Sequence, residues 1–198
     1  MKSVWRDQTN RECKTVSPVS LIVTAFSTVD DIRNTLTPRL ETRAGENDLW
    51  LLDLGKGNNR LGGSVLAQAT AQMGDSTPDV TDATLLKGFF DLIQSLNRQG
   101  RILAYHDRSD GGLLATLCEM AFASRCGLAM DVGCLAAGGA APLAVLFNEE
   151  LGAVIQTERQ ARDQVAAEIR RFGLDGIAHI IGRAIDGDEI RVAGSNQP

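Results

Sequence analysis

Twice in this chain a short apolar run leads directly into a turn rich in glycine and polar residues, and a helix-forming stretch follows the turn. Residues 49–52 lead into the turn 53–64, and residues 102–105 lead into the turn 106–112. Such runs are typical of strands buried inside a sheet. Strands and helices alternate early in the chain, and strands gather later. This order predicts an α+β fold with a mixed sheet covered by helices, rather than a purely parallel dinucleotide-binding sheet.

The pattern of apolar residues also predicts where each element lies. Predicted strands are 19–26, 49–52, 102–105, 128–132, 142–147, 152–156, 177–182 and 188–192. Predicted helices run from Ser64 to Met73, from Thr81 or Asp82 to Gly100, from residue 112 to Ser124, and from Thr157 or Glu158 to Gly173. We expect residues 1–18 to form an arm or linker, residues 19–193 one domain, and residues 194–198 a tail.

Composition excludes several classes of function. The 198 residues carry a net charge of -5, so no general basic field attracts nucleic acid polymers or anionic membranes. Aromatic residues make up only 5%, which argues against stacking of single strands. No run of 18 apolar residues and no secretory signal is visible, and the four cysteines form no C-x-x-C pair. We therefore expect a cytoplasmic protein with free thiols that does not insert into a membrane.

The first turn is a candidate phosphate loop. Its glycines allow the backbone to approach a ligand closely, and the amides at the start of the next helix favour an anion. The pattern is neither a Walker A loop nor a dinucleotide fingerprint. The alternative is an ordinary strand-to-helix turn capped by Ser64. The candidate residues are Gly55, Gly57, Asn58, Gly62, Gly63 and Ser64.

The second turn contains several side chains that are able to bind a metal ion or a phosphate. Asp107 and Asp110 carry the hard oxygen ligands that Mg²⁺ prefers. Ser109 is able to bind a phosphate or cap the following helix, and Gly111-Gly112 permits positive φ. The alternative is a polar turn before a capped helix, in which Asp110 stabilises the helix dipole.

Three other polar features have plainer interpretations. The Asn148-Glu149-Glu150 segment lies between apolar runs and is expected to be a hairpin turn with solvated carboxylates. His179 lies inside an apolar strand pattern and is expected to be half-buried and structural. The predicted helix 158–172 mixes both signs of charge, which indicates a solvated face.

Three long segments resemble one protein family. They are Leu52–Gln68 with its glycine-rich centre, Ala104–Leu114 (AYHDRSDGGLL), and Leu146–Gln156 (LFNEELGAVIQ). Together they resemble the large, single-chain form of phosphoribosylformylglycinamidine synthase, also called formylglycinamide ribonucleotide amidotransferase. The resemblance extends from about Val4 to Val192.

This resemblance implies both a fold and a reaction. The family contains two related synthetase halves, and the chain resembles the α/β domain of the second half, which is like the C-terminal domain of aminoimidazole ribonucleotide synthetase. A three-layer mixed-sheet α+β fold is implied. The implied reaction consumes formylglycinamide ribonucleotide, glutamine, ATP and water, and yields formylglycinamidine ribonucleotide, glutamate, ADP and phosphate. This is an ATP-dependent ligase reaction of purine biosynthesis.

The resemblance also assigns roles to residues. Asp107 matches a Mg²⁺ ligand and Ser109 matches a contact to ATP or ADP, while His106, Gly111 and Gly112 shape the same nucleotide-binding loop. The glycine-rich turn lies where related proteins meet a substrate phosphate. No catalytic residue is expected, because none of the four cysteines has the context of a nucleophile. The Mg²⁺ site is expected to be shared with domains that this sequence does not contain.

Two alternatives stay open at this point. The chain is either part of another ATP-using member of the superfamily, such as a thiamine monophosphate kinase or selenophosphate synthetase, or a catalytically silent structural module. Its expected partners are the remaining domains of a longer polypeptide and a nucleotide. The isolated chain is expected to be inactive, and to self-associate through exposed apolar surface.

Overall fold

The computed structural model describes residues 2–6, 9–16, 23–29, 31–42, 46–136 and 139–193. Two compact units are present, Met1–Arg33 and Asn34–Pro198. In the first unit, β1 (Lys2–Arg6) and β2 (Glu12–Val16) form an antiparallel hairpin in which Trp5 lies opposite Cys13. Every residue of this unit whose burial is described is exposed or partly exposed. The predicted arm thus contains two strands that its polar composition did not indicate.

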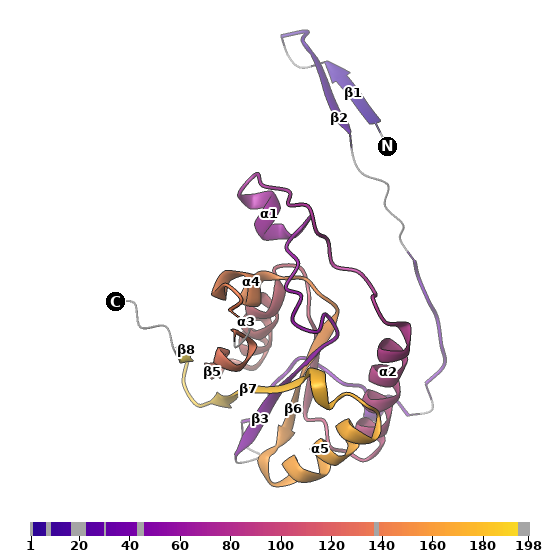
Figure 1. Ribbon diagram of the computed structural model, residues 1–198, viewed down its shortest axis with the longest axis vertical. Helices are drawn as coiled ribbons and strands as arrows, with labels where there is room; N and C mark the ends of the chain where they lie inside the picture. Colours follow the sequence, from indigo (N-terminus) through magenta and orange to yellow (C-terminus); the bar gives the residue numbers. More distant parts are fainter. Residues whose placement is uncertain are drawn as a thin grey trace. The chain divides into compact units, whose positions relative to one another are not determined.

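The second unit is built on a six-stranded sheet with the order β4-β6-β3-β7-β5-β8 (Figure 1). Neighbouring strands are antiparallel except β5 and β8, which are parallel. The predicted mixed sheet is therefore confirmed. The strands are β3 (Asn47–Asp53), β4 (Ala104–Asp107), β5 (Gly127–Asp131), β6 (Gly152–Glu158), β7 (Ala178–Ile185) and β8 (Ile190–Ala193).

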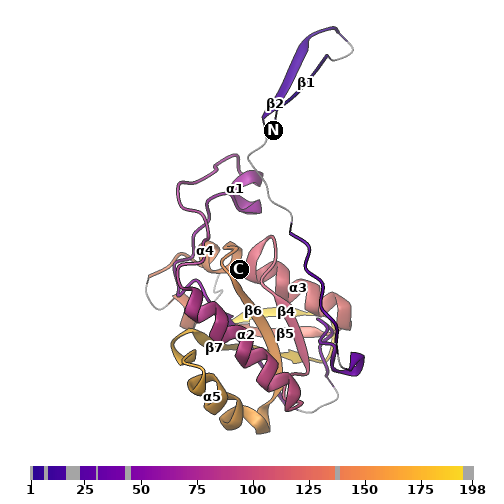
Figure 2. The same cartoon turned by 90° about the vertical axis from the view of Figure 1, so that its right-hand side faces the viewer.

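Helices cover both faces of this sheet, so the unit has the three layers expected (Figure 2). The helices are α1 (Val65–Ala69), α2 (Ala83–Arg98), α3 (Gly112–Ser124), α4 (Pro142–Phe147) and α5 (Arg162–Arg171). Short 3-10 turns are η1 (Ile32–Asn34), η2 (Gly133–Ala136), η3 (Arg159–Ala161) and η4 (Asp175–Ile177). The predicted helix 64–73 is thus much shorter than expected, and the other three predicted helices correspond to α2, α3 and α5.

The central strand β3 explains why the sequence has a continuous apolar run here. Leu49 and Leu51 point to one face of the sheet and pack with α3, whereas Trp50 and Leu52 point to the other face and pack with α2 and α5. Every residue of β3 is buried. When both faces of a strand are buried, no position faces water. The sequence from Leu49 to Leu52 is therefore apolar throughout and does not alternate between apolar and polar residues.

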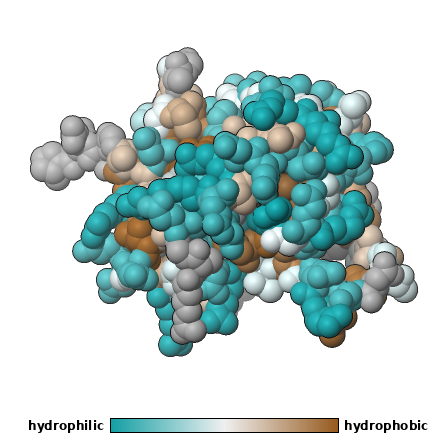
Figure 3. Space-filling model, turned by 90° about the horizontal axis from the view of Figure 1, so that it is seen from below, coloured by the Kyte–Doolittle hydropathy of each residue, from teal (hydrophilic) through white to brown (hydrophobic). Residues whose placement is uncertain are grey.

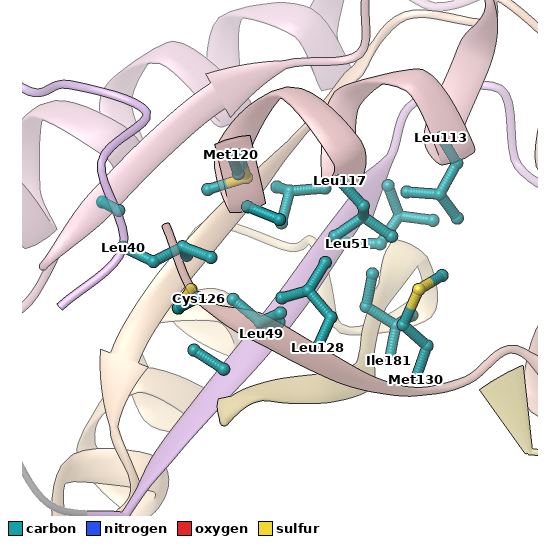
Figure 4. Packing of buried hydrophobic residues seen from close by; sticks show 14 residues of the cluster. Leu40, Leu49, Leu51, Leu113, Leu117, Met120, Cys126, Leu128, Met130 and Ile181 are labelled. Atoms are coloured by element: carbon teal, nitrogen blue, oxygen red, sulfur yellow. The ribbon is translucent and has the colours of Figure 1, made fainter. Parts of the chain in front are cut away.

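The core on the α3 side is shown in Figure 4. Leu113, Leu117 and Met120 project from α3 onto Leu49 and Leu51 of β3. All five side chains are at most 1% exposed. Burial of such side chains supplies about 1.5–3 kcal/mol each. This packing fixes α3, and with it the loop that precedes α3, against the sheet.

Two element predictions are wrong or incomplete. Residues 142–147 form helix α4, not a strand, and Pro142 lies in its first turn, where a missing amide costs nothing. A six-residue apolar run does not by itself distinguish the two states. For the predicted strand 19–26, residues 23–26 lie outside any strand. Residues 19–22 lie outside the described part of the chain, as does the predicted tail 194–198.

The face seen in Figure 3 is mostly hydrophilic, with small hydrophobic areas between the hydrophilic residues. Large apolar side chains that are more than half exposed in the second unit are Met73, Phe90, Phe122 and Leu143. Self-association through such residues stays a prediction. Among the described residues, no helix combines the length and the apolar character that crossing a membrane requires.

Candidate functional site

Three segments that are far apart in sequence leave the same edge of the sheet. β3 ends at Asp53, β4 ends at Asp107, and β6 lies between these two strands. The antiparallel register pairs Asp53 with Gly152, the first residue of β6. The two turns singled out in the sequence and the segment 148–151 are therefore neighbours.

A buried arginine connects these segments. The side chain of Arg108 is 1% exposed and forms an ion pair with the carboxylate of Asp53. Its guanidinium also donates hydrogen bonds to the Asn148 side chain at 2.9 Å and to the carbonyls of Glu150 and Leu151 at 2.6 and 2.9 Å. Because a buried charge is stable only when it is paired and hydrogen-bonded, these contacts fix the segments relative to one another.

A second arginine extends this arrangement to the glycine-rich turn. The Glu150 carboxylate is 1% exposed and accepts hydrogen bonds from Arg60 Nε at 2.6 Å and Nη2 at 2.7 Å. These bonds raise the pKa of the Arg60 guanidinium above its usual value, so this arginine stays protonated. We refer to Asp53, Arg60, Arg108, Asn148 and Glu150 as the buried network.

The prediction of a hairpin turn with solvated carboxylates at 148–150 is wrong, because helix α4 precedes the segment and one of the two carboxylates is buried. Asn148 is 0% exposed and Glu150 is 1% exposed. Asn148 also donates hydrogen bonds to Asn59 Oδ1 at 2.9 Å and to the carbonyl of Ala144 at 2.7 Å. The reason lies in the sheet register, which places this segment beside two arginines that are distant in sequence.

The amides of the predicted phosphate loop donate hydrogen bonds inside the protein. The Asp53 carboxylate accepts those of Gly55 at 3.2 Å and Gly57 at 2.7 Å. Four further amides donate to backbone carbonyls at 2.7–3.1 Å, those of Asn58, Gly62, Gly63 and Ser64. The Ser64 hydroxyl accepts a hydrogen bond from Ala67 and caps α1. This geometry matches the alternative of a capped turn, and phosphate binding by the loop stays a prediction.

Asp107, the predicted metal ligand, is exposed at the end of β4. The Tyr105 hydroxyl donates a hydrogen bond to Asp107 Oδ1. Burial, together with this contact, raises the pKa of Tyr105 above its usual value, so the hydroxyl stays protonated and remains a donor. The tyrosine thereby orients a hard oxygen ligand of the kind that Mg²⁺ prefers.

Two predicted nucleotide contacts share one carboxylate. The Nε2 atom of His106 lies 3.0 Å from Glu119 Oε2, and the Ser109 hydroxyl donates to the same oxygen at 3.1 Å. The amide of Gly111 donates to Glu149 Oε1 at 2.9 Å. The structure thus brings three of the four predicted nucleotide-binding residues into contact with acidic side chains.

Gly112, the fourth, is required where the loop enters α3. Its φ is +75°, and a Cβ atom there would lie 2.6 Å from the carbonyl oxygen of Asn148. An L side chain is disfavoured by both the conformation and the space. The glycine therefore permits the close approach of α3 to the buried network.

Within the described ranges, no three or more His, Cys, Asp or Glu residues form a group able to hold a metal ion. Asp107 and the exposed Asp110 offer carboxylates to a site that other segments would have to complete. Burial raises the pKa of the thiols of Cys118 and Cys126, which keeps them protonated and weakly nucleophilic.

A cavity of about 190 Å³ adjoins the buried network. Asp53, Lys56, Arg108, Cys134 and His179 contribute to its lining. His179 lies partly exposed in β7, as predicted for a half-buried strand residue. Pockets that enclose drug-sized ligands measure about 300–1,000 Å³, so this cavity is too small for a whole nucleotide.

Sequence reasoning missed the partners that hold the site. It gave no role to Asp53, Arg60, Tyr105 or Glu119, and it placed Glu150 in solvent. One signal was available: Asp53, Arg108 and Glu150 each lie next to an apolar strand run. Polar side chains at strand ends on one sheet edge often meet. The pairing of each residue depended on a strand order that the sequence did not reveal.

Comparison with known proteins identifies related folds. Residues 49–195 match the family described as AIR synthase related protein, C-terminal domain. Thermotoga maritima PurL complexed with ATP has a TM-score of 0.63 at 14% identity, covering 84% of this chain and 26% of that chain. The same protein complexed with FGAR has a TM-score of 0.64 at 14% identity, covering 83% of this chain and 28% of that chain.

A second kind of relative has the same fold. E. coli HypE, a hydrogenase maturation protein, has a TM-score of 0.54 at 23% identity, covering 82% of this chain and 50% of that chain. The chain therefore spans about a quarter of PurL and half of HypE. These structural similarities concern the fold, whereas the family match covers well over half of the sequence, from β3 to the last strand. The protein belongs to the AIR synthase related family and carries that family's C-terminal domain.

Proposed function

We propose that this chain is the α/β domain of the second synthetase half of a large, single-chain phosphoribosylformylglycinamidine synthase. The whole ligase would use ATP and glutamine to convert formylglycinamide ribonucleotide to formylglycinamidine ribonucleotide. The chain covers only about a quarter of the related PurL structures, so we propose that it is inactive alone and works with the remaining domains.

One observation carries this proposal. The three segments that resemble the synthase are separated by tens of residues, yet they meet at one sheet edge through the buried network. PurL structures with ATP, ADP and FGAR share the fold, which supports a nucleotide-related role. A shared edge that carries all three motifs is the expected place for a ligand contact.

The proposed roles follow from the exposed side chains at this edge. Asp107 would supply one oxygen ligand to Mg²⁺, oriented by the Tyr105 hydroxyl. Ser109 would donate a hydrogen bond to a nucleotide phosphate, and His106 and Gly111 would complete the loop. The remaining ligands of the cation would be phosphate oxygens, water and side chains of other domains.

A catalytically silent structural module is a second candidate, and the glycine-rich turn favours it. All six amides of the predicted phosphate loop already donate inside the protein. A loop built to hold a phosphate presents amides to the ligand instead. The two candidates differ in one measurable property, which is binding of ligand to this domain.

Calorimetric titration tests the proposal directly. Mg-ADP, Mg-ATP, formylglycinamide ribonucleotide and thiamine monophosphate are titrated separately into the chain and into an Asp107→Ala variant. Saturable binding of Mg-ADP that is lost in the variant supports a nucleotide site at the loop 106–112. Binding of formylglycinamide ribonucleotide, without binding of thiamine monophosphate, supports the amidotransferase over other superfamily members.

Absence of binding has a definite meaning as well. If no ligand binds at millimolar concentration, the site needs domains other than this one, and the chain alone is better described as a structural module. A far-UV circular dichroism spectrum of the Asp107→Ala variant serves as the control for folding. Asp107 is exposed, so we expect the spectrum to match that of the unmodified chain.

A further inference from the structure

Glu119 of α3 contacts two polar side chains of the proposed nucleotide loop, those of His106 and Ser109. One of its carboxylate oxygens, Oε2, lies 3.0 Å from His106 Nε2 and accepts a hydrogen bond from the Ser109 hydroxyl at 3.1 Å. The Glu119 side chain is 52% exposed, so it is held by these contacts and not by packing. An exposed carboxylate of this kind is free to move when a stronger partner arrives.

A phosphate would need the same donor. The Ser109 hydroxyl has a single proton, which it gives to Glu119 here. The Gly111 amide of the same loop donates to another carboxylate, that of Glu149. The loop therefore already holds two anionic groups at positions where phosphate oxygens would bind. Ligand binding requires that Glu119 leave Ser109.

Charge adds to this competition. Asp107 lies two residues before Ser109, so a phosphate near Ser109 approaches two exposed carboxylates. The cation within this loop, Arg108, does not offset them, because its guanidinium is buried and paired with Asp53. An uncomplexed nucleotide, which is a polyanion, is therefore repelled, whereas a divalent cation on its phosphates cancels the repulsion.

We infer that Glu119 makes the loop selective for the metal complex of a nucleotide over the free nucleotide. This rests on the proposed function, since it assumes that Ser109 meets a phosphate. Glu119 is a specificity-determining residue in this role. It does not itself need to touch the ligand.

The test compares metal-free and metal-bound ADP. Binding of ADP with EDTA and of Mg-ADP is measured by calorimetry for the unmodified chain, Glu119→Gln, Glu119→Asp and Glu189→Gln. Glu119→Gln removes the charge with little change of shape. Glu119→Asp keeps the charge but shortens the reach to Ser109. Glu189, also an exposed glutamate, lies beside β8 and pairs with Arg191, so its variant controls for net charge.

The inference predicts a specific pattern. The unmodified chain and Glu189→Gln bind Mg-ADP and bind free ADP at least tenfold more weakly. Glu119→Gln strengthens binding of free ADP by about fivefold, the size expected for one partly exposed charge. Glu119→Asp strengthens it less, since the charge remains. Thermal unfolding of every variant is expected to match that of the unmodified chain.

Other outcomes separate this inference from the proposed function. If Mg-ADP binds and Glu119→Gln leaves the ratio of the two affinities unchanged, the role of Glu119 is wrong and the nucleotide site stands. If Glu189→Gln changes the ratio as much as Glu119→Gln, the effect is one of net charge, and the inference fails. If neither form of ADP binds any variant, this chain alone holds no nucleotide site, and the inference about its loop fails.

Discussion

Neighbouring residues of one loop belong to two different environments. Arg108 is 1% exposed and bonded to two other segments, whereas Asp107 is exposed and Ser109 is partly exposed. Successive residues at a strand end point to opposite sides, so one short sequence contributes both to the scaffold and to the candidate ligand surface. Stability and ligand binding are therefore expected to respond to different substitutions within three adjacent positions.

Replacing Arg108 is expected to have the largest effect. Arg108→Met leaves the Asp53 carboxylate buried without its partner, so the free energy of unfolding falls by about 3–5 kcal/mol. Urea denaturation followed by circular dichroism measures the change. The double variant Asp53→Asn/Arg108→Met should recover part of the loss, because the unpaired charge is gone. A loss below about 1 kcal/mol would contradict the role of Arg108 as the central contact.

Glu150→Gln is expected to have an intermediate effect. The substitution keeps the shape of a side chain that is 1% exposed but removes the charge that pairs with Arg60. We expect a loss of about 1–3 kcal/mol in the free energy of unfolding, because the hydrogen bonds involved are charged and buried. Glu149→Gln is the matched control. The new amide oxygen at position 149 can still accept the hydrogen bond from Gly111. Near-equal losses of unfolding free energy in the two variants would show that the burial of Glu150 does not determine the size of the effect.

Asp48, at the opposite end of β3, is expected to make a smaller contribution to the free energy of unfolding, and this contribution depends on pH. Burial raises the pKa of Asp48, but hydrogen bonds and charges from Arg162 and Arg159 outweigh it and lower the pKa below the usual value. The folded state is therefore stabilised above the usual pKa of an aspartate, and this stability is lost as the pH falls through the lowered value. The guanidinium partners are 31% and 43% exposed, so the effect should be smaller than that of Glu150→Gln.

Denaturation curves between neutral pH and pH 2 test this expectation. In Asp48→Asn the part of the acid-induced loss that belongs to Asp48 should disappear, and the variant should be less stable than the unmodified chain at neutral pH. Identical pH profiles for the two proteins would show that the Asp48 ion pairs contribute nothing.

Ser109→Ala is expected to have the smallest effect on stability. The hydroxyl donates to the exposed Glu119 and lies 3.5 Å from the hydroxyl of the buried Thr116, a long contact, so the free energy of unfolding should change by less than about 0.5 kcal/mol. Binding of Mg-ADP should nevertheless weaken, which calorimetry detects. A loss of stability as large as that of Glu150→Gln would contradict the assignment of Ser109 to the ligand surface and not to the buried scaffold.

The sequence predicted the sheet, most helices and both turns because these depend on local patterns. Leu49–Leu52 and the helical spacing of Leu85, Phe89 and Leu96 need no knowledge of distant contacts. Helix α4 was missed because its apolar run is short, and Pro142, which suits a first helical turn, was not weighed. The buried position of Glu150 was missed because it depends on which strands are neighbours.

The strand order has a consequence for how the chain folds. β6 lies between β3 and β4, so the strand that ends at Asp53 and the strand that precedes Arg108 pair with a later segment and not with each other. The contacts of the buried network span 55 residues from Asp53 to Arg108 and 90 residues from Arg60 to Glu150. Contacts of such long range form slowly, because a large loop must close first. During synthesis the candidate ligand surface therefore exists only after β6 has been made, and a chain truncated before that strand would lack it.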